Sequence, residues 1–288
     1  MESILASVGR GGRNSPDDVK VVQRLLSKIV TEINLVEDGR MGPKTIAGLA
    51  YFQGRYVGLT PSGIVYPNDS TLIELNKGPC DCWRPSDRLT LPPKGNLSVL
   101  KLSDYELVAN ELKCELDALR AIAMCESRGG GFLPDGRPKI LFEAHHFAKK
   151  TDHQYNDAFP DISSRSWNRK LYSTATGEYK RLAKAMALDR SAALQSTSWG
   201  TFQLMGFNHV ECGFGNSVEA MIKAMFQDEV QHLKAFKTFL VTRSIVAPLI
   251  KKDWHRVAFL YNGKRYAENL YHLKLQANYE KLSKASKK

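Results

Sequence analysis

The chain has few cysteines, no long apolar run and no metalloprotease motif, and each absence excludes a class of protein. Its five cysteines are an odd number at irregular spacing, which argues against a disulfide framework. No run of about 18 apolar residues is present, so we expect no segment that spans a membrane. The N-terminus has Glu2 where a secretory signal would have a base, and its apolar stretch is short. The sequence therefore predicts a protein made in the cytoplasm without a signal peptide.

The sequence gives little support to a metal site. Cys114 and Cys125 follow an apolar helical pattern, which is typical of core thiols. Cys80 and Cys82 could contribute ligands, but no second pair at ligand spacing follows them. A zinc peptidase would need an H-E-x-x-H segment, which is absent. The histidines considered for that alternative are His145, His146, His153 and His209. We expect no metal and no cofactor.

The composition is ordinary for a globular protein, but the charge is not. The chain has 288 residues, of which 43% are hydrophobic and 25% charged, enough for one large or two modest domains. Its formal net charge is +11. Residues 1–77 contain nine Lys and Arg against eight Asp and Glu, so the other 211 residues carry a net charge of +10. Such a charge favours a polyanionic neighbour and leaves nucleic acid, an acidic membrane and an anionic wall polymer open.

Residues 1–77 predict a small helical module. Apolar residues from Val19 to Ile29 recur three or four apart on one helical face. A glycine turn follows, Pro43 restarts a helix, and a third short helix follows Ser70. Residues 78–102 contain four prolines and predict a semi-rigid linker. Later helices are expected at about 178–194, 217–241, 244–262 and 265–283, and no internal repeat is evident.

The stretch from Ala121 to Phe132 holds the strongest candidate for chemistry. Leu112, Leu116 and Ile122 continue a helical apolar pattern that ends at Glu126, just before three glycines. A carboxylate at a helix C-terminus is disfavoured by the helix dipole, so its position needs a reason. At the apolar end of a buried helix the pKa of a carboxyl group rises, which suits a proton donor.

Three later segments supply the other groups that a sugar site needs. An apolar run contains Glu143, residues 196–209 form a loop rich in small and amide side chains, and residues 258–263 end a helix with a phenol and an amide. Amides and phenols bind sugar hydroxyl and acetamido groups, and an acid protonates the glycosidic oxygen. The expected substrate-binding residues are Ser198, Trp199, Gln203, Asn208, Tyr261 and Asn262.

The N-terminal pattern resembles the three-helix peptidoglycan-binding domain. It shows Val19, Gln23 and Leu26, then D-G-R-M-G-P-K-T from Asp38, then Phe52-Gln53. Gly63-Ile-Val65 and Thr71 to Leu75 follow in the family's order. The resemblance implies a wall-binding module whose marker residues are Asp38, Gly39, Gly42, Thr45 and Gln53; the alternative is that these residues only shape turns.

The C-terminal motifs resemble the N-acetylmuramidase domain of modular bacteriophage endolysins, in the lysozyme-like superfamily. The order is E-S, F-E, S-x-S-W-G-x-x-Q-x-M-G-x-N-H and Y-N-G, over about residues 104–283. The resemblance implies a mainly α protein with a peptidoglycan-binding domain at 1–77, a linker at 78–102 and a lysozyme-like catalytic domain at 103–288. It implies that Glu126 is the general acid for cleavage of the β-1,4 bond between N-acetylmuramic acid and N-acetylglucosamine, causing host cell lysis.

The second step of the reaction stays open. Glu143 is the chosen second carboxylate, with a purely structural role as its alternative. The reserves are Asp135, Asp152, Asp157 and Asp161. A lytic transglycosylase would need Glu126 alone, because the C6 hydroxyl of the sugar attacks and forms a 1,6-anhydro product. Ser198 lacks the G-x-S-x-G elbow of a nucleophile.

The resemblance implies peptidoglycan as the substrate. The basic charge of the second part of the chain favours an anionic membrane or lipopolysaccharide as a further partner. We expect a monomer that binds no nucleic acid. It would remain in the host cytoplasm until a separate pore-forming protein releases it to the periplasm. Two rivals from other classes are a non-catalytic wall-binding protein and a nucleic-acid binder, the latter suggested only by charge.

Overall fold

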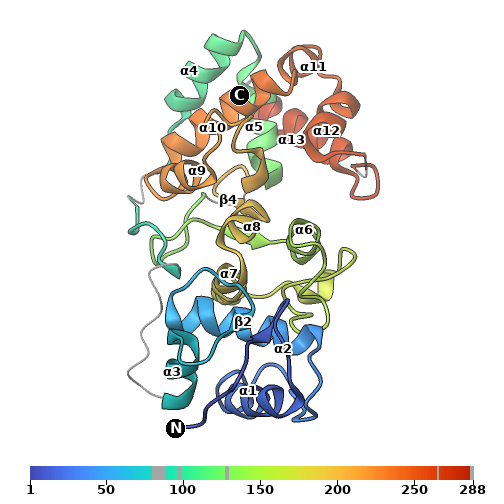
Figure 1. Ribbon diagram of the computed structural model, residues 1–288. Coiled ribbons are helices and arrows are strands. Elements are labelled where there is room, and N and C mark those ends of the chain that lie inside the picture. Colours follow the sequence, from blue (N-terminus) through green and yellow to red (C-terminus); the bar gives the residue numbers. More distant parts are fainter. Residues whose placement is uncertain (80–88, 96–98, 127–129, 265, 286–288) are drawn as a thin grey trace. The chain divides into compact units, whose positions relative to one another are not determined.

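The fold is mainly α-helical, as the sequence predicts. The computed structural model describes residues 1–79, 89–95, 99–126, 130–264 and 266–285. In this part of the chain, regular structure consists of helices and a few short strands (Figure 1). None of the described helices combines the length and apolar character that a membrane crossing requires.

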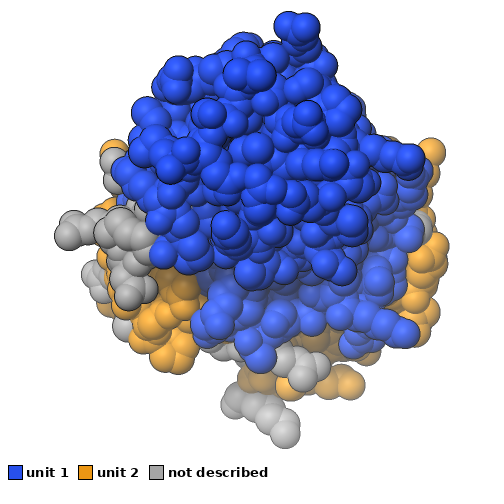
Figure 2. Space-filling view, turned by 60° about the horizontal axis from the view of Figure 1, so that its bottom comes forward, with its two compact units in different colours: residues 1–91, 142–197 blue, residues 92–141, 198–288 orange. Residues whose placement is uncertain are grey.

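The chain forms two compact units that do not follow the order of the sequence. Unit 1 contains Met1–Leu91 and Phe142–Thr197, and unit 2 contains Pro92–Leu141 and Ser198–Lys288; Figure 2 colours them separately. The elements of unit 1 are β1 (Val8–Gly9), α1 (Pro16–Ile29), α2 (Pro43–Phe52), the π-helix η1 (Gln53–Val57), β2 (Ile64–Val65), α3 (Ser70–Lys77), α6 (Ala144–Lys150), the 3-10 helix η3 (Arg169–Leu171), α7 (Ala175–Leu188) and α8 (Arg190–Gln195).

Unit 2 carries most of the later helices. Its elements are α4 (Leu102–Leu112), α5 (Leu116–Glu126), β5 (Leu204–Met205), the 3-10 helix η4 (Gly206–Asn208), α9 (Val218–Met225), α10 (Glu229–Thr242), α11 (Val246–Ile250), α12 (Trp254–Asn262) and α13 (Tyr271–Ala285). Strands β3 (Ile140–Phe142) and β4 (Thr197–Trp199) each run from one unit into the other along the chain.

The three helices expected in residues 1–77 are present as α1, α2 and α3. The buried face of α1 includes Val19, Val22 and Leu26, as its spacing predicts. Strands β1 and β2 pair antiparallel, with Val8 opposite Val65. A Cβ on Gly9 would lie 2.2 Å from the carbonyl oxygen of Gly63, so the two strands can approach only because Gly9 has no side chain.

Two buried glutamines reveal a repeat that the sequence did not make evident. The Gln23 side chain accepts the N–H of Gly39 at 3.0 Å and donates to Asp38 at 2.9 Å. The Gln53 side chain accepts the N–H of Gly63 at 2.9 Å and donates to the carbonyl of Ile64 at 2.8 Å. Each glutamine therefore holds one glycine turn, because an amide can both donate and accept.

The N-terminal helices pack on α7 within unit 1. A Cβ added to Gly54 would lie 1.8 Å from the carbonyl oxygen of Ala187, so the backbones of η1 and α7 touch directly. The rings of Tyr51 and Phe159 also pack together in unit 1, with centroids 5.1 Å apart. Residues 142–197 therefore share a core with residues 1–77.

In unit 2, the single helix expected to lead to Glu126 is instead two helices, α4 and α5. Lys113 adopts a left-handed conformation with φ of 53° and ends α4. Helix α5 restarts at Leu116 and buries Leu119 and Ile122 completely. Figure 1 shows α13 alongside α5, and these two helices pack together.

Aspartate N-caps divide the long helices expected downstream. The side chain of Asp189 accepts the N–H of Ala192 and separates α7 from α8. Asp228 caps α10 in the same way, and Asp253 caps α12. An aspartate at this position satisfies a helical N–H that has no partner within the helix, so it favours a new start over continuation.

Gly54→Ala should destabilise the protein by about 1 to 3 kcal/mol, because the added methyl meets backbone rather than a movable side chain. Thermal unfolding of the purified full-length chain measures the effect. Gly42→Ala is the matched control, since a Cβ there meets nothing within 4 Å. Equal melting temperatures for the two variants would contradict the close backbone contact.

Candidate active site

Glu126 is the last residue of α5, and helix α13 packs against α5. The hydroxyl of Tyr271, the first residue of α13, donates a hydrogen bond to Oε1 of Glu126. Asn278, two turns further along α13, donates to the carbonyl of Ala121 at 3.4 Å and contacts Sγ of Cys125 at 3.2 Å. Polar groups of α13 thus fix the end of α5.

The surroundings of Glu126 raise its pKa to about 7, mainly because burial disfavours the charged form. The Tyr271 hydrogen bond and the charge of Lys274 act in the opposite direction and lower it. The glutamate keeps some accessible surface, but protein encloses its carboxyl group on most sides. A carboxyl group with a pKa near 7 is partly protonated at neutral pH and can donate a proton.

A chain of contacts links Glu126 to Tyr261 through Tyr271. The rings of Tyr271 and Tyr261 are nearly parallel, with centroids 6.0 Å apart and planes 8° apart. The hydroxyl of Tyr261 donates to the carbonyl of Phe202 at 2.7 Å. Phe202 precedes Gln203, so this hydrogen bond attaches the predicted polar loop to α12 within unit 2.

The glycine-rich segment after α5 is held by a buried carboxylate that the sequence analysis did not identify. Glu229, only 3% exposed, accepts the N–H of Gly131 and the N–H of Leu100. A Cβ on Gly131 would lie 2.2 Å from Oγ1 of Thr201, so no side chain fits there. Glycine at position 131 thus allows the backbone to approach the polar loop closely.

His232 supports the same loop as a neutral imidazole. Its Nε2 lies 2.7 Å from the carbonyl of Met225 and donates to it, and Nδ1 accepts the N–H of Thr201 at 3.2 Å. Burial lowers the pKa of His232, which favours this neutral form. The ring of Phe132 stacks on the imidazole with centroids 5.0 Å apart.

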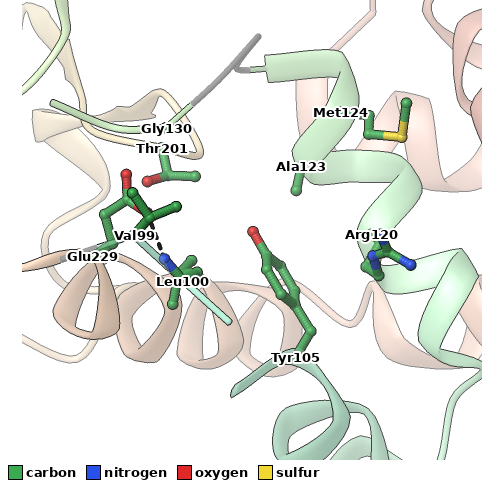
Figure 3. Close-up of a pocket in the computed structure, with 9 residues that line it drawn as sticks. All are labelled: Val99, Leu100, Tyr105, Arg120, Ala123, Met124, Gly130, Thr201 and Glu229. Carbon is green, nitrogen blue, oxygen red and sulfur yellow. Dashed lines mark hydrogen bonds between the residues drawn. The ribbon is translucent and has the colours of Figure 1, made fainter. Parts of the chain in front are cut away.

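A pocket of about 180 Å³ lies along another side of α5 in unit 2. Figure 3 shows the Tyr105 hydroxyl directed into it, with Ala123 of α5 on one side and Glu229 on the other. Glu126 is not among the residues that line it, so the pocket is separate from the carboxyl group. Ala123 is one helical turn before Glu126, which places the pocket within one turn of the acid.

The predicted polar loop is tightly bonded within itself. Ser198 Oγ donates to Gln203 at 2.8 Å, and the Gln203 amide donates to the carbonyls of Gly200 and Lys139. Gln203 has a φ of 45°, an uncommon conformation for a non-glycine residue. The structure brings Ser198 and Gln203 together, and their side chains hold the loop in shape.

Trp199 is not placed to bind substrate. Its side chain has no exposed surface, and its ring packs near Phe226 with centroids 6.2 Å apart. We therefore assign Trp199 to the core rather than to a sugar-binding surface. Asn208 is half-buried at the end of η4, and Asn262 is exposed at the end of α12, so both remain candidates.

Glu143, the predicted second carboxylate, lies in unit 1, whereas Glu126 lies in unit 2. The hydroxyl of Tyr172 lies 2.8 and 2.9 Å from its two oxygens, and His145 Nδ1 is 3.3 Å from Oε2. Burial raises the pKa of Tyr172, so it stays a donor. Among the described residues, the partners of the Glu143 carboxylate are the side chains of Tyr172 and His145.

Two of the four reserve carboxylates have basic partners, whereas Asp152 and Asp157 are exposed; the expected wall-binding residues have structural roles. Asp135 pairs with Arg137 and Asp161 with Lys184. Asp38, Gly39, Thr45 and Gln53 contribute to the two glutamine-held turns, and Gly42 caps α2. Within the described ranges, no three His, Cys, Asp or Glu residues gather as a metal site. Cys80 and Cys82 lie outside these ranges; Cys114, Cys125 and Cys212 are free.

Comparison with known proteins identifies the family. The N-acetylmuramidase family profile matches residues 115–283, more than half of the chain. This chain belongs to the N-acetylmuramidase family. The enzyme is a glycoside hydrolase, as predicted. A crystal structure of a Burkholderia AP3 phage endolysin is similar, with 33% identity, a TM-score of 0.58, and coverage of 97% of this chain and 99% of that one. A search of curated proteins found no match.

The matched region contains the residues that sequence reasoning missed. Tyr271, Glu229 and His232 all lie within residues 115–283. The sequence of the last helix contained a signal for Tyr271. The residues that recur at helical spacing on one of its faces are Tyr271, Leu275, Asn278 and Leu282, and this face combines polar groups with apolar ones. Glu229 lies in the first turn of α10, where its sequence position resembles that of any acidic residue near a helix start.

Glu126→Gln should become more stable than the wild type as pH rises from about 4.5 to about 7. The pKa of Glu126 is about 7 in the folded enzyme and about 4.5 for an ordinary glutamate, so the folded state holds the proton over this range and loses stability as pH rises. Gln removes that loss, worth about 1 to 3 kcal/mol above pH 7.

Thermal unfolding of both proteins between pH 4 and 8 tests this prediction. Glu106→Gln removes an exposed carboxylate on α4 and controls for the change in net charge. A gap between Glu126→Gln and wild type that stays constant across the range would contradict the raised pKa.

Proposed function

We propose that the enzyme cleaves the β-1,4 bond between N-acetylmuramic acid and N-acetylglucosamine, with Glu126 as the general acid, and so lyses the host cell. The observation that supports this role is the carboxyl group at the end of α5, partly enclosed beside Tyr271, with a pKa of about 7. Its proton would pass to the glycosidic oxygen as the bond to the anomeric carbon breaks. The peptidoglycan-cleaving character agrees with the N-acetylmuramidase family and with the endolysin likeness.

The second step has two candidate routes. In the hydrolytic route a carboxylate activates water, and we propose Glu143 for this role because Tyr172 and His145 hold it as an acceptor. In the transglycosylase route the C6 hydroxyl of the muramic acid attacks, and Glu126 removes its proton. Mass spectrometry of released muropeptides separates the routes, since an anhydro product is one water lighter than a hydrolytic one.

We propose that residues 1–77 bind the cell wall and that residues 103–288 carry out catalysis, joined by residues 78–102. The two glutamine-held turns expose loops on a rigid three-helix body, which suits recognition of a repeating polymer. Residues 142–197 would belong to the catalytic sequence while packing with the wall-binding helices in unit 1. We propose that the enzyme acts as a monomer and stays in the host cytoplasm until lysis.

Glu126→Gln should lower lysis of permeabilised Gram-negative cells by several orders of magnitude, on the order of 10³-fold or more, because the amide keeps the shape but has no transferable proton. Pull-down on purified sacculi should be unchanged. Glu106→Gln is the control for expression and charge. Lysis at the wild-type rate by Glu126→Gln would sink the assignment. Complete absence of lysis by the wild type would support a non-catalytic wall-binding protein.

A second partner is suggested by the charge of the last 38 residues. Residues 251–288 contain ten Lys and Arg against three Asp and Glu. Leu270 and Leu273 are 54% and 50% exposed among these bases. Basic residues next to exposed apolar ones suit a surface of anionic lipid phosphates. We propose that this surface contacts anionic membrane lipid or the phosphates of lipopolysaccharide.

The enzyme should bind phosphatidylglycerol vesicles at low salt and release them as salt rises, because the attraction is screened. Leu273→Ser combined with Lys264→Gln should weaken this binding several-fold in a sedimentation assay, on the order of one kcal/mol per base removed. Leu5→Ser, which changes an apolar residue of unit 1 that is 94% exposed, is the control. Equal binding to neutral phosphatidylcholine vesicles would rule the proposal out.

A further inference from the structure

The two oxygens of Glu126 have different surroundings. Oε1 accepts the hydroxyl of Tyr271. Oε2 has no hydrogen-bond partner among the residues that the structure describes. A neutral carboxyl group has one O–H, and an oxygen that already accepts a hydrogen bond is the less favourable place for it. The asymmetry therefore favours the proton on Oε2.

Tyr271 itself is held in place by three features. Its side chain is 6% exposed, and its ring lies parallel to that of Tyr261. Its N–H donates to the carbonyl of Tyr266 at 3.0 Å. The preceding residue, Leu270, has a φ of 52°, a strained conformation for a leucine, and turns the chain into α13. The hydroxyl of Tyr261 is bonded to Phe202, so Tyr271 is the phenol that serves Glu126.

We propose that Tyr271 is a positioning residue that directs the transferable proton of Glu126 to Oε2 and stabilises the carboxylate left after transfer. This inference rests on the proposed role of Glu126 as general acid. The proton leaves Oε2 for the glycosidic oxygen, which receives the electron pair of the broken bond, and Tyr271 keeps its own proton throughout. Its hydrogen bond becomes charge-assisted as the carboxylate forms, and so strengthens as the reaction proceeds.

The groups that face this pair set the direction of the expected pH effect. Around Glu126 they are Tyr271 and Lys274 of α13, Tyr261 of α12 and the neighbouring Cys125, and Cys212 lies near Tyr261. Burial and the charge of Glu126 raise the pKa of Tyr271 well above 10, so it remains a donor wherever the enzyme works. Removing its hydroxyl should therefore raise the pKa of Glu126.

Tyr271→Phe tests the proposal in the full-length enzyme acting on purified peptidoglycan. We expect kcat to fall about ten- to hundredfold, with the alkaline limb of kcat/KM displaced to higher pH. Tyr279→Phe is the matched control, because Tyr279 lies two turns further along α13 and donates to Glu115 at 2.6 Å. This variant should keep the wild-type rate and pH profile. An alkaline limb that does not move, or moves to lower pH, would overturn the proposal.

A measurement that does not depend on enzyme activity separates the role of Tyr271 from the proposed function. In NMR with labelled glutamate, the signal missing from Glu126→Gln identifies the Glu126 carboxyl carbon, which should titrate at higher pH in Tyr271→Phe. If that variant does not fold, the Cζ signal of Tyr271 in the wild type should follow the Glu126 titration, and independence of the two would refute the pairing. Retained lysis by Glu126→Gln would instead reject the acid role.

Discussion

Keeping one carboxyl group partly out of water is the constraint on which the arrangement of unit 2 depends. Helix α5 is apolar from Ala121 to Cys125, and Glu126 stands where the negative end of the helix dipole also opposes a charge. Helix α13 then covers the carboxyl group from the side. Burial outweighs the Tyr271 hydrogen bond and the charge of Lys274, which lower the pKa, so a glutamate that would be charged in water is partly neutral at pH 7.

Buried side chains also hold the backbone at Gly131 and at Thr201. The buried carboxylate of Glu229 binds two backbone N–H groups from segments on either side of α4 and α5. Neutral His232 fixes the facing loop through Thr201. The side chains of Glu229 and His232 thus hold backbone in place, whereas the carboxyl group of Glu126 has a pKa raised to about 7.

Much of the fold could be predicted from local pattern, but not its breaks or its long-range partners. Apolar spacing located α1 and the end of α5, because one helical face must be buried. It did not locate the break before α12, because the cap made by Asp253 outweighs an otherwise continuous pattern. In the candidate site, motif order singled out Glu126 and Tyr261, which the structure connects through Tyr271, and it also pointed to Trp199, whose buried ring lies in the core.

Tyr271 could not be paired with Glu126 from sequence because 145 residues separate them. Only docking of α13 on α5 brings them together, and this docking also uses Asn278 and Tyr279. Before the last helix docks, the carboxyl group would be solvated and ionised at neutral pH, like any exposed glutamate. The partly neutral form of Glu126 at pH 7 therefore depends on α13 being packed against α5, because this packing encloses the carboxyl group.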